Sequence, residues 1–97
     1  MRTAFVNKLM ELASKDERIV LITGDMGFPM FDEFKKLYPD RYYNMGIAEQ
    51  NMIGVAAGLA MRGKKPYVYS IIPFLIMRSY EQVRVDICYH NLDIKLI

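Results

Sequence analysis

The sequence predicts an α/β domain of three layers, in which helices cover both faces of a doubly wound, mostly parallel sheet. Two observations predict this class. Short apolar segments rich in β-branched residues alternate with longer segments of helical periodicity, which is the order of parallel βαβ units. Residues 19–23, Ile-Val-Leu-Ile-Thr, have no polar face, as expected for a strand covered on both sides. A chain of 97 residues holds at most one domain, so residues 1–97 are taken as one unit.

Helices and strands are expected in alternation along the chain. Apolar residues at Phe5, Leu9 and Leu12 recur at helical spacing, which makes the first element an amphipathic helix. Pro39 bars continuation of the second helix, and β-branched and aromatic residues predict the strands. In order, the expected elements are a helix at 2–16, a strand at 19–23, a short helix at 31–37, a strand at 41–44, a helix at 47–62, a strand at 67–72, a helix from 73 to about 90 and a strand at 94–97.

The helix at 47–62 carries no charge between Met52 and Met61, so we expect it to be buried on all sides. Gly63 provides its C-terminal stop. Pro73 opens the following helix in its first turn. That helix carries Phe74, Met77, Tyr80, Arg84 and Ile87.

Composition excludes several classes of protein. Apolar residues make up 53% and charged residues 25%, which is typical of a globular chain. The net charge is only +2, and the Lys and Arg residues form no continuous basic stripe, so nucleic acid is not expected as a partner. The longest uncharged helical run has 10 residues, at 52–61, well below the roughly 18 of a membrane span. Cys88 is the only cysteine, so it cannot form an internal disulfide, and no nearby residues complete the spacing of a zinc site. This fits a reducing cytoplasm.

The last expected strand is cut short while still apolar, which leaves hydrogen-bonding edges without partners. Parallel sheets also need cover on both faces. We therefore expect a domain that is incomplete at its C-terminal end, or a subunit that partner chains complete.

One carboxylate stands out in the segment Asn-Met-Gly-Ile-Ala-Glu-Gln-Asn at 44–51. Glu49 lies at the start of the apolar helix, and burial among apolar side chains disfavours a charged carboxylate and makes its proton available for catalysis. The alternative is that Glu49 is a first-turn acid that interacts with the helix dipole. Position alone leaves both interpretations open.

Three segments in register resemble the transketolase family of thiamine-diphosphate enzymes, in the pyrimidine-binding domain of its split members. They are Thr-Gly-Asp at 23–25, Gly-Ile-Ala-Glu-Gln at 46–50, and residues 73–84, which are similar to the pattern F-x-x-x-R-x-Y/W-D-Q-I-R. Glu81 stands where that pattern has Asp, and Val83 where it has Ile. His90 takes a position at which proline is common. The resemblance implies the thiamine-diphosphate-binding fold.

The resemblance also implies site residues. Glu49 would hydrogen-bond N1′ of the aminopyrimidine and promote ylide formation, and Phe74 would stack on that ring. Asp25 and Met26 would approach the thiazolium side, and Arg78 would reach a phosphorylated sugar. Three of these residues also have a structural alternative: Phe74 as a core aromatic, Asp25 as a turn residue, and Arg78 as the partner of a neighbouring carboxylate.

No metal site is expected on this chain. Gly24-Asp25-Met26, with Asn51 downstream, superficially resembles the Gly-Asp-Gly…Asn signature for diphosphate and magnesium, but its third residue is Met and Asn51 falls within the helix of Glu49. Mg²⁺ would therefore belong to a partner chain with the diphosphate-binding domain. Gly54 and Gly58 have a spacing that permits close packing, either at the interface with that domain or within this chain.

The resemblance implies a transketolase-like subunit, inactive alone, that works in a homo- or hetero-oligomer and transfers ketol units between sugar phosphates. Two alternatives within the class are a deoxyxylulose-phosphate synthase and the β-type subunit of a 2-oxo acid dehydrogenase. A third alternative is a noncatalytic, truncated oligomerisation module.

Overall fold

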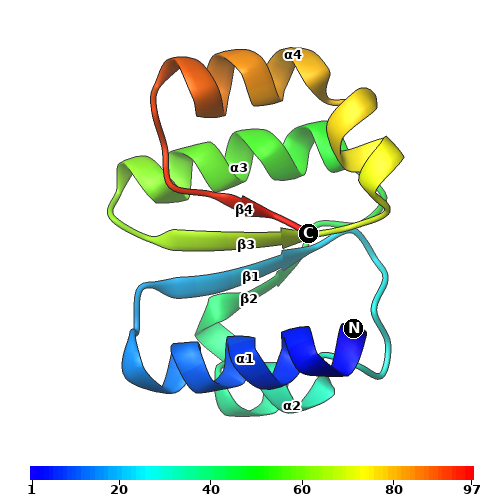
Figure 1. Cartoon of the computed structure of the whole chain (residues 1–97), viewed down its shortest axis with the longest axis vertical. Helices are drawn as coiled ribbons and strands as arrows, with labels where there is room; N and C mark the ends of the chain where they lie inside the picture. Colours follow the sequence, from blue (N-terminus) through cyan, green and yellow to red (C-terminus); the bar gives the residue numbers. More distant parts are fainter.

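The computed structural model describes all 97 residues and has three layers. Four parallel strands form one sheet in the order β2-β1-β3-β4, with α1 and α2 on one side of it and α3 and α4 on the other (Figure 1). The predicted fold class is therefore confirmed. The elements are α1 (Arg2–Lys15), β1 (Ile19–Thr23), α2 (Asp32–Leu37), the 3₁₀ turn η1 (Pro39–Arg41), β2 (Tyr42–Asn44), α3 (Glu49–Met61), β3 (Lys65–Tyr69), the π-helical η2 (Pro73–Met77), α4 (Tyr80–Gln82), the π-helical η3 (Val83–Tyr89) and β4 (Lys95–Leu96).

Strand β1 lies between β2 and β3, and all five of its residues are buried. Alternate side chains of a strand point to opposite faces. Ile19 and Leu21 accordingly pack on the α1 and α2 side, with Leu9 and Phe34, whereas Ile22 packs on the side of α3. Strand β1, which has no polar face, thus contributes side chains to the core on both sides of the sheet, as its composition predicted.

The expectation that the third helix is buried on all sides is wrong. Met52, Ile53 and Ala56 of α3 are fully buried, but Gly54 and Gly58 are exposed on the opposite side. A Cβ placed on either glycine would meet no atom within 4 Å, so neither glycine serves close packing within this chain. An uncharged face made of small residues resembles a buried face in sequence. None of the helices is both long and apolar enough to cross a membrane.

Strand β3 ends at Tyr69, three residues earlier than predicted. Its register pairs Tyr69 with Thr23, the last residue of β1, so β1 offers no partner to Ile71 and Ile72. Strand length is set here by the neighbours, which local propensity does not reveal.

The segment from Pro73 onward is helical, as predicted, but much of it is wound in wide turns. The amide of Arg78 donates to the carbonyl of Pro73 at 3.3 Å, five residues back, where an α-helix would bond four back. Short π-helical segments of this kind occur often at functional sites. Helix propensity does not distinguish the two windings, so the sequence contained no signal for them.

Candidate functional site

A small hollow lies where the strands β1 and β3 end, at the carboxyl edge of the sheet. It measures about 220 Å³, and its lining includes all five residues that the sequence singled out: Asp25, Met26, Glu49, Phe74 and Arg78. Open parallel sheets bind their ligands at this edge. The fold therefore brings together residues that are up to 53 positions apart (25 to 78) in the chain.

Glu49 is held in the first turn of α3 with only 5% of its surface exposed. The hydroxyl of Ser70, also buried, donates to Glu49 Oε1 at 3.3 Å. Arg78 Nη1 lies 3.7 Å from the other carboxylate oxygen, Oε2. The carboxyl is thus both a first-turn acid and a buried group, and it contacts one neutral donor and one cation.

The loop that precedes Glu49 is shaped by two glycines. Gly46 has φ +72°, a conformation that side chains other than glycine rarely adopt. Gly24 lies directly beneath the loop: a Cβ there would be 3.0 Å from Met52 Sδ and 3.4 Å from the carbonyl oxygen of Gly46. The absence of a side chain at Gly24 lets the start of α3 approach the end of β1, which places Glu49 over the edge of the sheet.

Phe74 and Arg78 lie side by side on the segment after β3. The Arg78 guanidinium carbon is 4.3 Å from the centroid of the Phe74 ring, within cation–π range. The side-chain amide of Gln50 donates to the Arg78 carbonyl at 3.1 Å and ties this segment to α3. Phe74 is 37% exposed, so its ring is not a buried core aromatic.

Asp25 adopts a left-handed backbone conformation, φ 55°, in the turn after β1. Asn44, at the end of β2, holds that turn: its Oδ1 accepts the amides of Asp25 at 2.9 Å and Gly46 at 3.0 Å, and its Nδ2 donates to Asp25 Oδ1 at 3.0 Å. Asp25 is therefore a turn residue whose exposed carboxylate lines the hollow. Met26 is half-buried beside it.

Ser70 and Asn44 were not among the site residues predicted from the sequence. Both are polar residues at or next to the carboxyl end of a strand, the position where ligand sites form in open sheets. A search for polar residues at predicted strand ends would have identified Asn44. It would not have identified Ser70, which lay inside the predicted strand 67–72. Only the true end of β3 at Tyr69 shows that Ser70 belongs to the edge.

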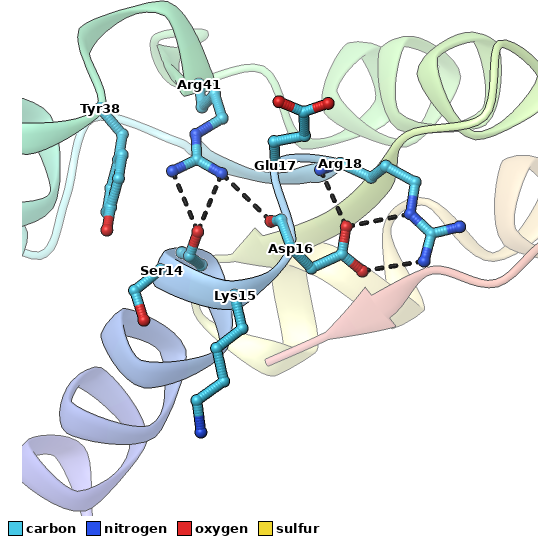
Figure 2. Close-up of a pocket in the computed structure, with 8 residues that line it drawn as sticks. Ser14, Lys15, Asp16, Glu17, Arg18, Tyr38 and Arg41 are labelled. Carbon is cyan, nitrogen blue, oxygen red and sulfur yellow. Dashed lines mark hydrogen bonds and ion pairs between the residues drawn. The ribbon is translucent and has the colours of Figure 1, made fainter.

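A second, more polar hollow lies at the opposite edge of the sheet, next to the start of β1 (Figure 2). Arg41 donates there to the carbonyls of Ala13 and Asp16, which satisfies the C-terminal end of α1. Arg18 forms two side-chain hydrogen bonds to Asp16 and holds the pKa of that carboxyl well below its usual range. Asp16, Arg18 and Arg41 are therefore already paired within the chain, which gives these three residues a structural role.

No three His, Cys, Asp or Glu side chains lie close enough together to hold a metal ion. Cys88 is a free, exposed thiol. His90 contacts the carbonyl of Val85 through Nδ1 at 2.9 Å and lies outside the hollow at the carboxyl edge.

Comparison with known proteins identifies the family. The family described as "Transketolase, pyrimidine binding domain" matches residues 1–97. A 6-deoxy-6-sulfo-D-fructose transketolase subunit of Clostridium sp. (strain MSTE9) is 40% identical over 98 residues, which cover 100% of this chain and 30% of the relative. A 1-deoxy-D-xylulose-5-phosphate synthase of Shouchella clausii (strain KSM-K16) is 43% identical over 93 residues, 95% of this chain and 15% of that protein.

A solved structure agrees with these relatives. The chain superimposes on a split-gene transketolase, described as an inactive beta4 tetramer, with a TM-score of 0.88 and 40% identity, over 98% of this chain and 32% of that one. The chain thus spans about a third or less of the length of these relatives. Fold, motifs and relatives agree, and the chain belongs to the transketolase family as its pyrimidine-binding domain.

Proposed function

We propose that this chain supplies the aminopyrimidine-binding half of a thiamine-diphosphate site, with Glu49 as the catalytic residue. The observation that carries the proposal is the placement of a buried carboxylate beside an accessible aromatic ring at the carboxyl edge of the sheet. A ring with nitrogen donors and acceptors needs these two contacts, a face to stack on and a carboxyl oxygen to bond.

The hollow fits one part of the cofactor and not the whole of it. Its volume of about 220 Å³ is below the roughly 300–1,000 Å³ of pockets that enclose an entire ligand. Phe74 offers a flat apolar face, and Glu49 offers a carboxylate oxygen on the same hollow. These features suit a single aromatic ring, and the diphosphate end would extend away from this chain.

The residues divide the work as follows. Ser70 holds Oε1 of Glu49, which leaves Oε2 as the oxygen that faces the ring and holds or moves the proton at N1′. Phe74 orients the ring by stacking. Asp25 and Met26, across the hollow, would face the thiazolium side. When bound, the cofactor supplies the carbanion chemistry, and the chain supplies orientation and the proton relay.

The reaction we propose is transketolase-like transfer of ketol units between sugar phosphates. Two relatives are named as transketolase subunits: the Clostridium protein for 6-deoxy-6-sulfo-D-fructose, and a protein of Phocaeicola vulgatus for apulose-4-phosphate. The diphosphate and Mg²⁺ would be held by a partner chain, since this chain has no Gly-Asp-Gly…Asn signature: Met26 follows Gly24-Asp25, and Asn51 lies within the helix of Glu49. We place that partner against the exposed face of α3 at Gly54 and Gly58, where the helix leaves room for a close approach.

Reconstitution tests the proposal. The chain would be mixed with a full-length partner that carries a Gly-Asp-Gly…Asn motif, and thiamine diphosphate with Mg²⁺ would be titrated by calorimetry. We expect tight binding by the pair and no appreciable binding by either chain alone. Tight binding of cofactor and metal by this chain as a monodisperse monomer would refute it. Turnover of a ketose phosphate, compared with pyruvate, then separates a transketolase from a deoxyxylulose-phosphate synthase or a 2-oxo acid dehydrogenase.

A further inference from the structure

Arg78 stands in the place that the proposed ring would take. Its guanidinium carbon is 4.3 Å from the Phe74 centroid, and its Nη1 is 3.7 Å from Glu49 Oε2. One small planar group makes both contacts, so it lies on the side of the Phe74 ring that is turned toward Glu49. These are the two contacts that the aminopyrimidine would use.

The chemistry of the two groups is alike. A guanidinium is planar and delocalised, carries N–H donors in its plane, and stacks on aromatic faces while it bonds carboxylates. An aminopyrimidine is also planar and its amino group carries N–H donors in the plane, whereas its ring nitrogen N1′ bonds the Glu49 carboxyl through a proton that one of the two carries. Two such groups cannot share one face of Phe74 and one oxygen of Glu49, because protein atoms pack at van der Waals contact.

We infer that Arg78 is a place-holder: its guanidinium occupies the pyrimidine position in the free chain, and the ring must displace it to bind. Arg78 would then set the affinity of the site, and a substrate phosphate could reach it only after displacement. This inference rests on the proposed function, because it assumes that an aminopyrimidine binds between Phe74 and Glu49.

The structure favours a movement of the side chain alone. The Arg78 side chain is 53% exposed, so solvent is available to receive it. The Arg78 backbone is fixed by two hydrogen bonds: its carbonyl accepts one from the Gln50 side chain, and its amide donates one to the carbonyl of Pro73. The separation of 3.7 Å from Glu49 is longer than a hydrogen bond, so the contact to be broken is a weak one.

A reason for the place-holder follows from burial. Glu49 is 5% exposed, and a buried carboxylate is costly without a partner of opposite charge. Arg78 supplies that partner until the ring arrives. Removal of the guanidinium deletes one exposed cation–π contact and one partly exposed ion pair, both of which compete with the ring. The loss of these two competing contacts predicts that a neutral pyrimidine binds the chain without the guanidinium about threefold to thirtyfold more tightly.

The test is a titration of the 97-residue chain with 4-amino-2-methylpyrimidine, followed by NMR at the amides of Glu49 and Phe74, at a pH where the probe is uncharged. Wild type would be compared with Arg78→Ala and with Arg84→Ala, which removes an exposed arginine of the same segment that forms no ion pair. We expect tighter binding by R78A and unchanged binding by R84A. Added salt should tighten binding by the wild type, because it screens the ion pair, and should leave R78A unaffected.

The possible results distinguish a failure of the place-holder role of Arg78 from a failure of the proposed pyrimidine site. Equal or weaker binding by R78A, with shifts still centred on Glu49 and Phe74, would overturn the place-holder and leave the pyrimidine site standing. Chemical-shift changes centred away from Glu49 and Phe74 would overturn both the place-holder and the pyrimidine site. The salt titration of the wild type decides the matter even if R78A fails to fold.

Discussion

Replacement of Glu49 by Gln should separate catalysis from folding more sharply than any other change in this chain. Glutamine has the same shape, and its amide oxygen can still accept the Ser70 hydroxyl that now lies 3.3 Å from Oε1. The structural loss is the contact with Arg78, which is 53% exposed, so the free energy of unfolding should fall by no more than about 1 kcal/mol. The amide cannot exchange a proton with N1′, and general acid–base catalysis is typically worth about 10²–10⁴-fold.

That factor corresponds to a barrier increase of about 2.7–5.4 kcal/mol, several times the effect on folding. The assay is hydrogen–deuterium exchange at C2 of the cofactor in the reconstituted enzyme, with urea unfolding of the same variant alongside. Glu81→Gln serves as the matched control, because Glu81 is an exposed acid that forms no ion pair. An unchanged exchange rate in E49Q would show that Glu49 does not act on the proton, and the catalytic assignment would fail.

Three other changes test the site and the fold. Ser70→Ala removes the donor to a buried carboxylate and should cost about 1–3 kcal/mol of unfolding free energy; a smaller loss when the same change is made in E49Q would show that the two groups are coupled, and equal losses would show that they are not. Phe34→Ala empties a fully buried position and should cost about 3–5 kcal/mol in urea unfolding, whereas Phe28→Ala, at a position 59% exposed, should cost little; similar costs would contradict the assigned core. The pKa of Asp16 is lowered in the folded chain by Arg18, so its stabilisation is present above the unfolded pKa of about 3.9 and is lost as pH falls below it. Asp16→Asn should therefore lower the urea midpoint at pH 7 and converge with the wild type in acid, and a constant gap at all pH values would refute this account.

Much of the fold follows from local patterns. Residues 19–23 have no polar side that could face water, and this single fact places β1 in the interior of a sheet covered on both faces. The alternation of strand and helix then requires parallel connections, which in turn bring the strand ends to one edge. Glu49 stood out as a carboxylate at the start of an apolar helix, and the resemblance to the transketolase family added Phe74 and Asp25, which follow strands at that edge.

The tertiary structure decided what local patterns do not encode. The end of β3 depends on where β1 ends, so Ser70 could be recognised as a partner of Glu49 only after the strands were paired. The exposed side of α3 depends on which neighbours cover it, and small uncharged residues are compatible with either outcome. The wide turns after Pro73 place Arg78 beside both Phe74 and Glu49. The periodicity of apolar residues indicates which side chains prefer the interior. Whether two side chains distant in sequence touch depends on backbone geometry, which only the folded chain defines.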